Sequence, residues 1–389
     1  MHRGNPTMAD DVAAKPAAHT GGHEPFLNKY FKSCIKMKVS DLHLKADRPA
    51  MVRMKGDIRP LQGGPLTGEQ IYNGIFELLS EDHKAEFKKM GAIDFAHDVG
   101  PMGDADRFRV NAFLQKGKMS VAARRVDRNI LNFAQLNLPP VMSEIAEFNQ
   151  GMVLLAGITG SGKSTTIAAI IDYINERWPV HIVTIEDPIE YLFNDKKAII
   201  NQREIGIDCP DFKSALKYLM REDPDIVLVG EMRDIETFSA AVHAAETGHL
   251  VFGTIHASSS AQTVGRILDL FPPNERRSVR QALEFNLQAV ICQKLVPCIK
   301  DEFPVVPAVE IMIANPSIRK LIREERDSEI SAVIRASYDA GMVDFTEHIR
   351  RLVDDGFIDH ETAYENAPNP DELKMALKGI RAASSVILG

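Results

Sequence analysis

The segment 157–164 has the residue types and the spacing of a phosphate-binding loop. It reads Gly-Ile-Thr-Gly-Ser-Gly-Lys-Ser and matches the pattern G-x-x-x-x-G-K-[ST] at every position. Glycines let backbone N–H groups converge on phosphates, the lysine reaches the β- and γ-phosphates, and the serine hydroxyl is a ligand for Mg²⁺. The pattern therefore predicts a site for ATP with Mg²⁺. The predicted nucleotide-binding residues of the loop are Gly157, Thr159, Gly160, Ser161, Gly162, Lys163, Ser164 and Thr165, of which Ser164 also binds the metal.

The sequence on either side of this loop supports the prediction. The apolar run Met152 to Ala156 reads as a buried strand, and Ile167, Ile170, Ile171 and Ile174 follow the loop at the spacing of one helix face. A strand, a glycine loop and a helix in this order place the positive end of the helix dipole at the phosphates. A glycine-rich turn without a ligand is the alternative, and this context argues against it.

Carboxylates follow two further apolar runs. Glu231 comes after the run 226–229 and is expected to contact Mg²⁺ and its water shell, although many buried strands end in an acidic residue. The segment 185–190 reads Ile-Glu-Asp-Pro-Ile-Glu. ATP hydrolysis requires a group that orients the attacking water and can accept its proton. We take Glu190 as the candidate because Pro188 stiffens its loop, while a merely solvated acidic loop is the open alternative.

Two histidines flank the apolar run 250–255. In a regular strand the Cα atoms of His249 and His256 would lie roughly 20 Å apart, so the two side chains cannot bind one metal ion. His256, at the expected carboxyl end of the strand, can donate a hydrogen bond to a γ-phosphate. An isolated histidine is more often a structural residue, so the histidines alone leave the question open.

Two arginines in the first third of the chain are further candidates. Arg109 and Arg124 lie on the alternating segments 107–112 and 120–126, which read as strands. Surface arginines are usually only solvated. A P-loop enzyme, however, commonly needs a positive charge delivered to the γ-phosphate by another element or subunit, and arginine stays charged and offers a planar set of donors.

The elements that carry these residues follow from the apolar pattern. Four short apolar runs alternate with helical patterns and predict the buried parallel sheet of an α/β fold, at 152–156, 180–185, 226–229 and 250–255. A proline pair at Pro139 and Pro140 breaks regular structure before this region. The predicted division is a disordered tail over 1–24, a small α+β domain over 25–128, a linker over 129–150, an α/β domain over 151–300 and a helical region over 301–389.

Composition argues against several classes of protein. The net charge of −8 argues against a dedicated nucleic-acid binder, which usually presents a basic face. No apolar run reaches the roughly 18 residues of a membrane span, and the N-terminus lacks the pattern of a secretory signal. We therefore expect a cytoplasmic protein. The four cysteines have no zinc-site spacing and are expected to be reduced.

Together the motifs resemble the secretion and pilus ATPase superfamily, and within it the PilT-type retraction ATPases, from Phe26 to Leu373. The segments that carry the resemblance are 40–44, 107–111, the phosphate-binding loop, an Asp box at 184–191, a Walker B region at 221–234 and a His box at 245–256. The implied fold is a PAS-like N-terminal domain joined to a RecA-like P-loop domain, with a helical C-terminal region. The implied assembly is a ring-shaped homo-hexamer.

The resemblance also implies roles for individual residues. Glu190 corresponds to the catalytic glutamate and Glu231 to the Walker B glutamate, which contributes to the metal site. The histidines of the His box, His249 and His256, are implied to sense the nucleotide state. The implied catalytic residues are Lys163, Glu190, Glu231, His256, Arg109 and Arg124, the last two approaching the γ-phosphate. His249, Arg221 and Arg233 join the residues implied to line the nucleotide site.

Two features favour pilus retraction over assembly or secretion. Assembly and secretion ATPases typically carry a four-cysteine zinc module, which this chain lacks. The segment 317–324 resembles the Ala-Ile-Arg-Asn-Leu-Ile-Arg-Glu segment of PilT, with departures at Ser317 and Lys320. These departures leave open an accessory retraction ATPase of the PilU type. A pilus-assembly or type II secretion ATPase is a second alternative, and a nucleic-acid translocase is an alternative of a different class.

The resemblance finally implies what the motor works on. The implied function is ATP hydrolysis that powers type IV pilus retraction and twitching motility. The implied partner is the pilus platform protein of the inner membrane, with a paralogous retraction ATPase as a further candidate and no nucleic acid expected. The implied location is the cytoplasmic side of the inner membrane, at the base of the pilus.

Overall fold

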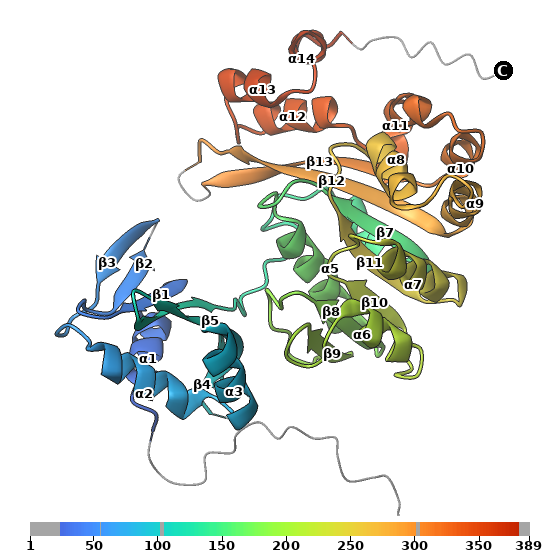
Figure 1. Ribbon diagram of the computed structural model, residues 1–389. Coiled ribbons are helices and arrows are strands. Elements are labelled where there is room, and N and C mark those ends of the chain that lie inside the picture. Colours follow the sequence, from blue (N-terminus) through green and yellow to red (C-terminus); the bar gives the residue numbers. More distant parts are fainter. Residues whose placement is uncertain (1–23, 55, 102–104, 301–303, 381–389) are drawn as a thin grey trace, which may run out of the picture. The chain divides into compact units, whose positions relative to one another are not determined.

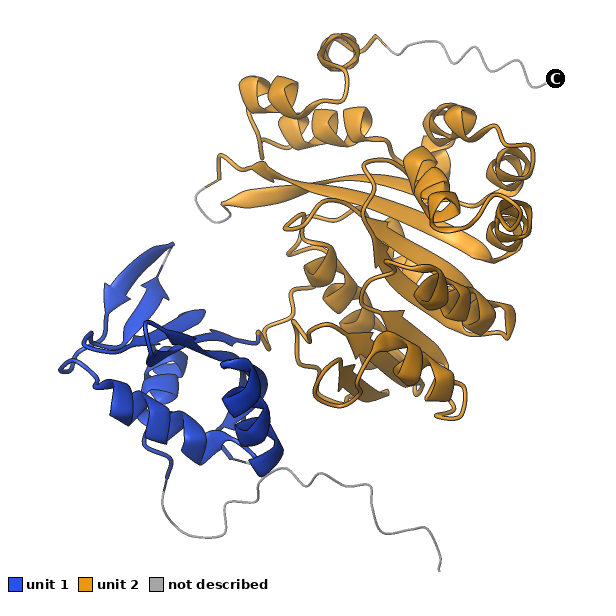
Figure 2. Ribbon diagram, in the orientation of Figure 1, with its two compact units in different colours: residues 1–126 blue, residues 127–389 orange. Residues whose placement is uncertain are grey.

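The computed structural model describes residues 24–54, 56–101, 105–300 and 304–380. The chain divides into two compact units between Val126 and Asp127 (Figure 2). The predicted tail over 1–24 lies, apart from Glu24, outside the described residues.

Unit 1 is an antiparallel sheet with three helices on one face. The strand order is β3-β2-β1-β6-β5-β4. The strands are β1 (Asp41–Lys45), β2 (Met51–Met54), β3 (Asp57–Pro60), β4 (Ala92–Val99), β5 (Asp106–Gln115) and β6 (Lys118–Arg125), and the helices are α1 (Asn28–Met37), α2 (Gly68–Leu78) and α3 (Glu81–Met90). Buried side chains alternate along β5, where Phe108 and Val110 pack against the helices. Arg109 therefore lies on the other face of the sheet.

Unit 2 is built on a seven-stranded sheet (Figure 1). The strand order is β13-β12-β7-β11-β10-β8-β9, and all neighbours are parallel except β12 and β13. The strands are β7 (Gly151–Ala156), β8 (His181–Glu186), β9 (Ile199–Glu204), β10 (Ile226–Val229), β11 (Leu250–Ile255), β12 (Leu287–Pro297) and β13 (Val305–Ile313). Because β7, β10 and β11 are buried on both faces, they read as continuous apolar runs.

Helices cover both faces of this sheet. The helices are α4 (Val141–Ala146), α5 (Lys163–Arg177), α6 (Phe212–Leu219), α7 (Ile235–Glu246), α8 (Ser260–Leu270), α9 (Arg276–Asn286), α10 (Pro316–Arg323), α11 (Ile330–Ala336), α12 (Phe345–Asp354), α13 (His360–Asn366) and α14 (Pro370–Leu377). One core packs α4 and α5 against Val153 and Leu155 of β7. The other packs α6, α7 and α8 against Met152 and Leu154 of the same strand. The central strands are thus enclosed on both sides.

The sequence predicts four of the seven strands of unit 2, and the other three were not predicted. The predicted runs are β7, β8, β10 and β11, whereas β9, β12 and β13 were missed. The prediction of a helical region over 301–389 is wrong for residues 305–313, because β13 pairs with β12 along its whole length. Residues 141–146, inside the predicted linker, form helix α4, whose Met142 and Ile145 are fully buried.

Two further observations bear on the expectations from composition. Within the described residues, none of the helices combines the length and the apolar character that a membrane crossing requires. The four cysteines are free, as expected from their spacing.

The place of β13 in the sheet predicts that the ATPase unit cannot end at residue 300. A chain cut there loses β13, whose Val306, Ala308 and Ile311 are fully buried, and uncovers the edge of β12. We expect this chain to lose the cooperative thermal transition of unit 2 in circular dichroism. A chain cut after residue 380 retains every described element and serves as the control. Cooperative unfolding of the shorter chain would contradict this view of the fold.

Candidate nucleotide site

The phosphate-binding loop lies between β7 and α5, at the carboxyl edge of the unit 2 sheet. Its conformation requires glycine, because φ is positive at Gly157, Gly160 and Gly162, with values of 153°, 77° and 86°. Helix α5 begins immediately afterwards, at Lys163. The loop therefore precedes a helix N-terminus, where backbone N–H groups and the helix dipole favour anions.

Lys163 is bonded to the loop itself. Its Nζ donates to the carbonyl oxygens of Gly157, at 2.8 Å, and Ile158, at 3.0 Å. Burial lowers the pKa of Lys163, while the carboxylates of Glu231 and Glu190 act in the opposite direction. The ammonium is thus held at the loop by two neutral acceptors, which phosphate oxygens can replace.

A polar pocket opens beside the loop and gathers residues from four segments. Its lining residues are Thr159, Gly160, Lys163, Ser164, Glu186, Asp187, Pro188, Glu190, Gly230, Glu231, Thr254 and His256. These segments follow β7, β8, β10 and β11, which are parallel, so their carboxyl ends meet at one edge. The pocket brings together seven of the residues predicted to bind or hydrolyse the nucleotide.

Glu231 lies in a cluster of charged side chains at the end of β10. Its carboxylate accepts hydrogen bonds from Arg233, at 2.5 Å, and from His256 Nε2, at 3.0 Å. The bond from Arg233 holds the pKa of Glu231 below its usual value despite partial burial. Glu231 is therefore ionised at neutral pH, and Arg233 and His256 are positioned through it.

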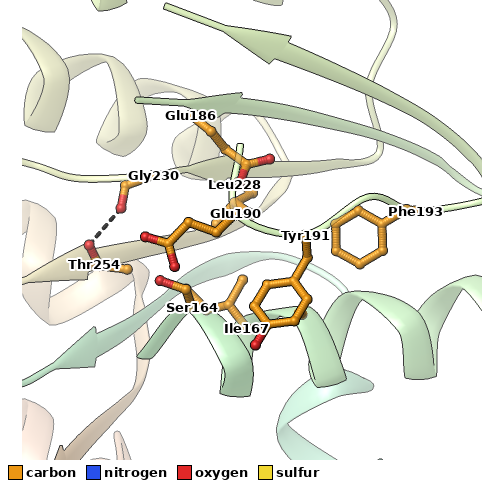
Figure 3. Close-up of a pocket in the computed structure, with 10 residues that line it drawn as sticks. Ser164, Ile167, Glu186, Glu190, Tyr191, Phe193, Leu228, Gly230 and Thr254 are labelled. Carbon is orange, nitrogen blue, oxygen red and sulfur yellow. Dashed lines mark hydrogen bonds between the residues drawn. The ribbon is translucent and has the colours of Figure 1, made fainter. Parts of the chain in front are cut away.

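Glu190 and Glu186 stand at the two ends of the loop that follows β8. In Figure 3 the Glu190 carboxylate points toward the side chains of Ser164 and Thr254, and both glutamates line a smaller cavity behind the main pocket. The Thr254 hydroxyl donates to the Gly230 carbonyl at 2.6 Å. The Glu190 carboxylate therefore lies in the pocket, next to the first residues of α5.

Glu186 is a site residue to which sequence reasoning gave no role. Its Oε1 accepts hydrogen bonds from Thr184, at 2.6 Å, and Gln202, at 3.2 Å, and the backbone N–H of Glu190 also donates to its carboxyl group. Burial nevertheless raises the pKa of Glu186 to about 7, and the Glu190 carboxylate adds to this effect. Its place at the end of a buried strand was visible in the sequence, but its partner on β9 was not.

Of the residues predicted to line the nucleotide site, Arg233 contacts the pocket only through Glu231, and two others lie at the opposite edge of the sheet. His249 precedes β11 and Arg221 precedes β10, so both lie at the amino edge of the sheet, opposite the pocket. His249 Nδ1 lies 2.9 Å from the Ala244 carbonyl, and the Arg221 guanidinium lies 5.8 Å from the Tyr218 ring. Strand polarity separates these two residues from the phosphate-binding loop.

The remaining predicted residues of the loop have supporting positions. Gly157, Ser161 and Gly162 are not among the lining residues of the pocket, and Ser161 is buried. The Thr165 hydroxyl lies 2.8 Å from the Tyr191 hydroxyl, which ties α5 to the loop after β8.

The two predicted arginines of unit 1 lie side by side. Arg109 and Arg124 are cross-strand neighbours of β5 and β6, and both line one hollow of the sheet with Asp41. Arg124 Nε donates to the Asp41 carboxylate at 2.7 Å. Burial opposes ionisation of Asp41, but hydrogen bonds from Ser40 and Arg124 outweigh it and lower its pKa. Unit 1 thus presents two guanidinium groups from one sheet face.

The donor set of the pocket suits Mg²⁺. Ser164 provides a hydroxyl oxygen and Glu231 a carboxylate, and both are hard oxygen ligands. Within the described residues no cluster of three or more His, Cys, Asp and Glu side chains is arranged to hold a metal ion alone. This fits Mg²⁺, which is usually held by one or two carboxylates together with substrate phosphates.

Known proteins resemble the chain over most of its length. Residues 17–317 match the model of the family described as "Type II/IV secretion system protein". The type IV pilus retractation ATPase PilT of Pseudomonas aeruginosa is 42% identical over 336 residues, which are 86% of this chain and 96% of that protein. The type IV pilus ATPase PilU of the same species is 33% identical over 350 residues, which are 90% of this chain and 91% of that protein.

A solved structure agrees with these relatives. The crystal structure of the pilus retraction motor PilT with bound ADP matches with a TM-score of 0.82 and 42% sequence identity. The match covers 90% of this chain and 98% of that chain.

The raised pKa of Glu186 predicts a pH-dependent difference in stability. Between about pH 4.5 and pH 7 the folded chain retains a proton that the unfolded chain releases, so this group destabilises the wild type as pH rises. Glu186→Gln lacks the proton equilibrium. We expect the thermal unfolding midpoint of the variant to rise relative to wild type from pH 5 to pH 7 and to level off above. An offset that does not change with pH would contradict the assignment.

Proposed function

This chain belongs to the family of type II/IV secretion system proteins and is an ATPase, and we propose that it works as a motor that retracts type IV pili. The proposal rests on one observation. A complete P-loop, with Lys163 and Ser164, shares a pocket with two carboxylates, Glu190 and Glu231, delivered by neighbouring parallel strands. This is the set of groups that ATP hydrolysis requires.

Each group has a role that its position supports. Lys163 exchanges its two loop carbonyls for phosphate oxygens. Ser164 and Glu231 would hold Mg²⁺, which would offset phosphate charge. Glu190 orients the attacking water and accepts its proton, because its carboxylate points toward Ser164 (Figure 3). His256, which is hydrogen-bonded to Glu231, donates a hydrogen bond to the terminal phosphate of ATP. This bond is absent with ADP, so His256 distinguishes the two nucleotides.

Retraction is supported over the other roles of the family by the relatives. PilT, described as a pilus retractation ATPase, is 42% identical and is matched over 96% of its length. PilU is less similar, at 33% identity. Primary retraction is therefore the function we favour, with an accessory role of the PilU type as the second candidate.

The motor hypothesis needs coupling between ATP and domain position. In our proposal unit 2 is a RecA-like ATPase domain and unit 1 a PAS-like domain, and six chains form a ring. Arg109 and Arg124 approach the γ-phosphate of bound ATP and release it after hydrolysis. ATP then stabilises one domain arrangement through contacts that ADP cannot make, which is the condition for a population shift.

The force is proposed to act on a membrane partner. The ring lies on the cytoplasmic side of the inner membrane, where successive closures of its subunits rotate or translate the pilus platform protein at the axis of the ring. Two features of the chain are compatible with this partner. The net charge of −8 argues weakly against a nucleic-acid partner, and the chain departs from the PilT segment at only Ser317 and Lys320 between residues 317 and 324.

Glu190→Gln tests the catalytic assignment. We expect ATP hydrolysis to fall by at least about 100-fold, because general-base assistance contributes roughly that factor, while nucleotide affinity is retained. Phosphate release and binding of a fluorescent ADP analogue measure the two properties. Lys163→Ala is the matched comparison and should lose nucleotide affinity itself. Turnover near that of wild type in the Glu190 variant would remove Glu190 from the mechanism.

Deletion of the gene in its own host tests the direction of force. Loss of a retraction motor should leave excess surface pili and abolish twitching, and the wild-type gene should restore both, whereas the Glu190→Gln gene should not. Electron microscopy of surface pili and a surface-spreading assay provide the measurements. A strain without any pili would instead identify an assembly ATPase. Hyperpiliation with partial twitching would favour the accessory role.

A further inference from the structure

A buried glutamine far from the loop in sequence contacts the phosphate-binding loop directly. Gln293 lies on β12, one residue beyond the paired residues Cys292 and Ala156 of β12 and β7. Because β7 leads into the loop at Gly157, Gln293 lies beside the first residue of the loop. Its side chain is 3% exposed, so it makes its contacts in the interior.

The amide of Gln293 joins the top of the loop to the first turn of α5. Its Nε2 donates to the Ser161 carbonyl at 2.9 Å, and its Oε1 accepts from the Thr166 hydroxyl at 2.8 Å. The orientation of the Gln293 amide follows from its partners. The Ser161 carbonyl oxygen can only accept a hydrogen bond, so the NH₂ group of Gln293 must face it. Both polar ends of the side chain are therefore used at the loop.

Gln293 also lies close to two glycines of the motif, both of which have positive φ. A Cβ on Gly157 would lie 2.5 Å from the backbone oxygen of Gln293 and 2.5 Å from Ser161 Oγ, and a Cβ on Gly162 would lie 2.6 Å from Gln293 Nε2. A Cβ on Gly160 would meet nothing within 4 Å, so only its positive φ calls for glycine there. The loop is thus shaped on one side to receive Gln293.

The position of Gln293 matters because Lys163 must change partners. Lys163 now bonds to the Gly157 and Ile158 carbonyls and has to leave them to reach a phosphate. The bonds of Gln293 involve Ser161 and Thr166 instead, so they persist through that exchange. They hold the backbone between these residues while the ammonium moves.

The next residue of β12 faces the opposite side of the sheet. Lys294 donates to the carbonyl of Asn366, at the end of α13, and its ammonium lies 4.8 Å from the centre of the Phe345 ring on α12. Adjacent residues of one strand thus contact the loop on one face and the C-terminal helices on the other.

We propose that Gln293 is a positioning residue of the nucleotide site, which keeps the phosphate-binding loop in its binding conformation by joining Ser161 to Thr166. Gln293 does not line the pocket and touches no predicted phosphate position, so it acts only through the loop. The inference rests on nucleotide binding and not on pilus retraction.

Gln293→Leu in the full chain tests the proposal, because leucine fills similar space without hydrogen bonds. We expect the Kd for a fluorescent ADP analogue and the KM for ATP to rise about tenfold, with kcat changed by less than about threefold. Kd and KM rise while kcat changes little because the loop binds the phosphates equally well in the ground state and in the transition state. A purely structural role would lower the thermal unfolding midpoint of the nucleotide-free chain and leave Kd unchanged, which would overturn the proposal.

Two further variants complete the test. Gln288→Leu is the matched control, since Gln288 lies on the same strand, at the end away from the loop, and bonds Arg319 at 3.1 Å. Its ADP affinity should equal that of wild type. Thr166→Val removes only the hydrogen bond between Thr166 and Gln293, so it should weaken ADP binding less than Gln293→Leu does. If Gln293→Leu does not fold, the ADP affinity of Thr166→Val tests the proposal in its place.

The outcomes separate this inference from the proposed function. Wild-type affinity in both Gln293→Leu and Thr166→Val would overturn the inference alone. In the double variant the Thr166 substitution should add little, because the bond it removes is already lost. A wild-type chain without affinity for ADP would overturn both the inference and the proposed function.

Discussion

The nucleotide site depends on one constraint: a loop that turns its N–H groups toward a phosphate has only one buried side chain, that of Ser161, with which to hold its own shape. Three glycines with positive φ give the loop between β7 and α5 its path, but they also give it freedom. The restraint comes from outside the loop, from the amide of Gln293 on β12. Lys163 adds a temporary restraint, because it bonds the loop carbonyls until a phosphate replaces them.

Convergence of parallel strands creates a second problem, the repulsion of carboxylates at one edge. Glu231 is stabilised in its charged form by Arg233 and His256. The pKa of Glu186 shifts in the opposite direction from that of Glu231. Burial raises it to about 7, so this carboxyl group can be protonated and neutral. The carboxylate that points at Ser164 is that of Glu190. The pocket thus gathers four acidic side chains, Glu186, Asp187, Glu190 and Glu231, and the repulsion among them is limited by ion pairing at Glu231 and by protonation at Glu186.

The sequence predicted those parts of the fold that depend on local pattern. The runs of β10 and β11 were located to the residue because strands buried on both faces are continuously apolar. Strand β12 was missed because Gln293 and Lys294 interrupt its apolar pattern. Gln293 is buried and Lys294 is half-buried, and each donates a hydrogen bond to a carbonyl group far away in the sequence. Strand β13 contains Pro307 and is accommodated at an edge of the sheet, where a missing N–H costs little.

The same distinction applies to the site. Roles could be predicted for motif residues such as Lys163 and Glu231 because each lies in a short contiguous motif of characteristic sequence. Gln293 lies 132 residues from Ser161, and no local spacing announces that pair. Glu186 was visible as the end of a strand, but its proton affinity depends on Gln202 of β9 and on how deeply the loop covers it.

Strand polarity also limits what one chain can do with the residues of the His box. His249 and His256 lie at opposite ends of β11, so a nucleotide in the loop of this chain can meet His256 and not His249. Arg221 lies at the same far edge as His249. If these two residues contact a nucleotide, that nucleotide must be held by a different copy of the chain.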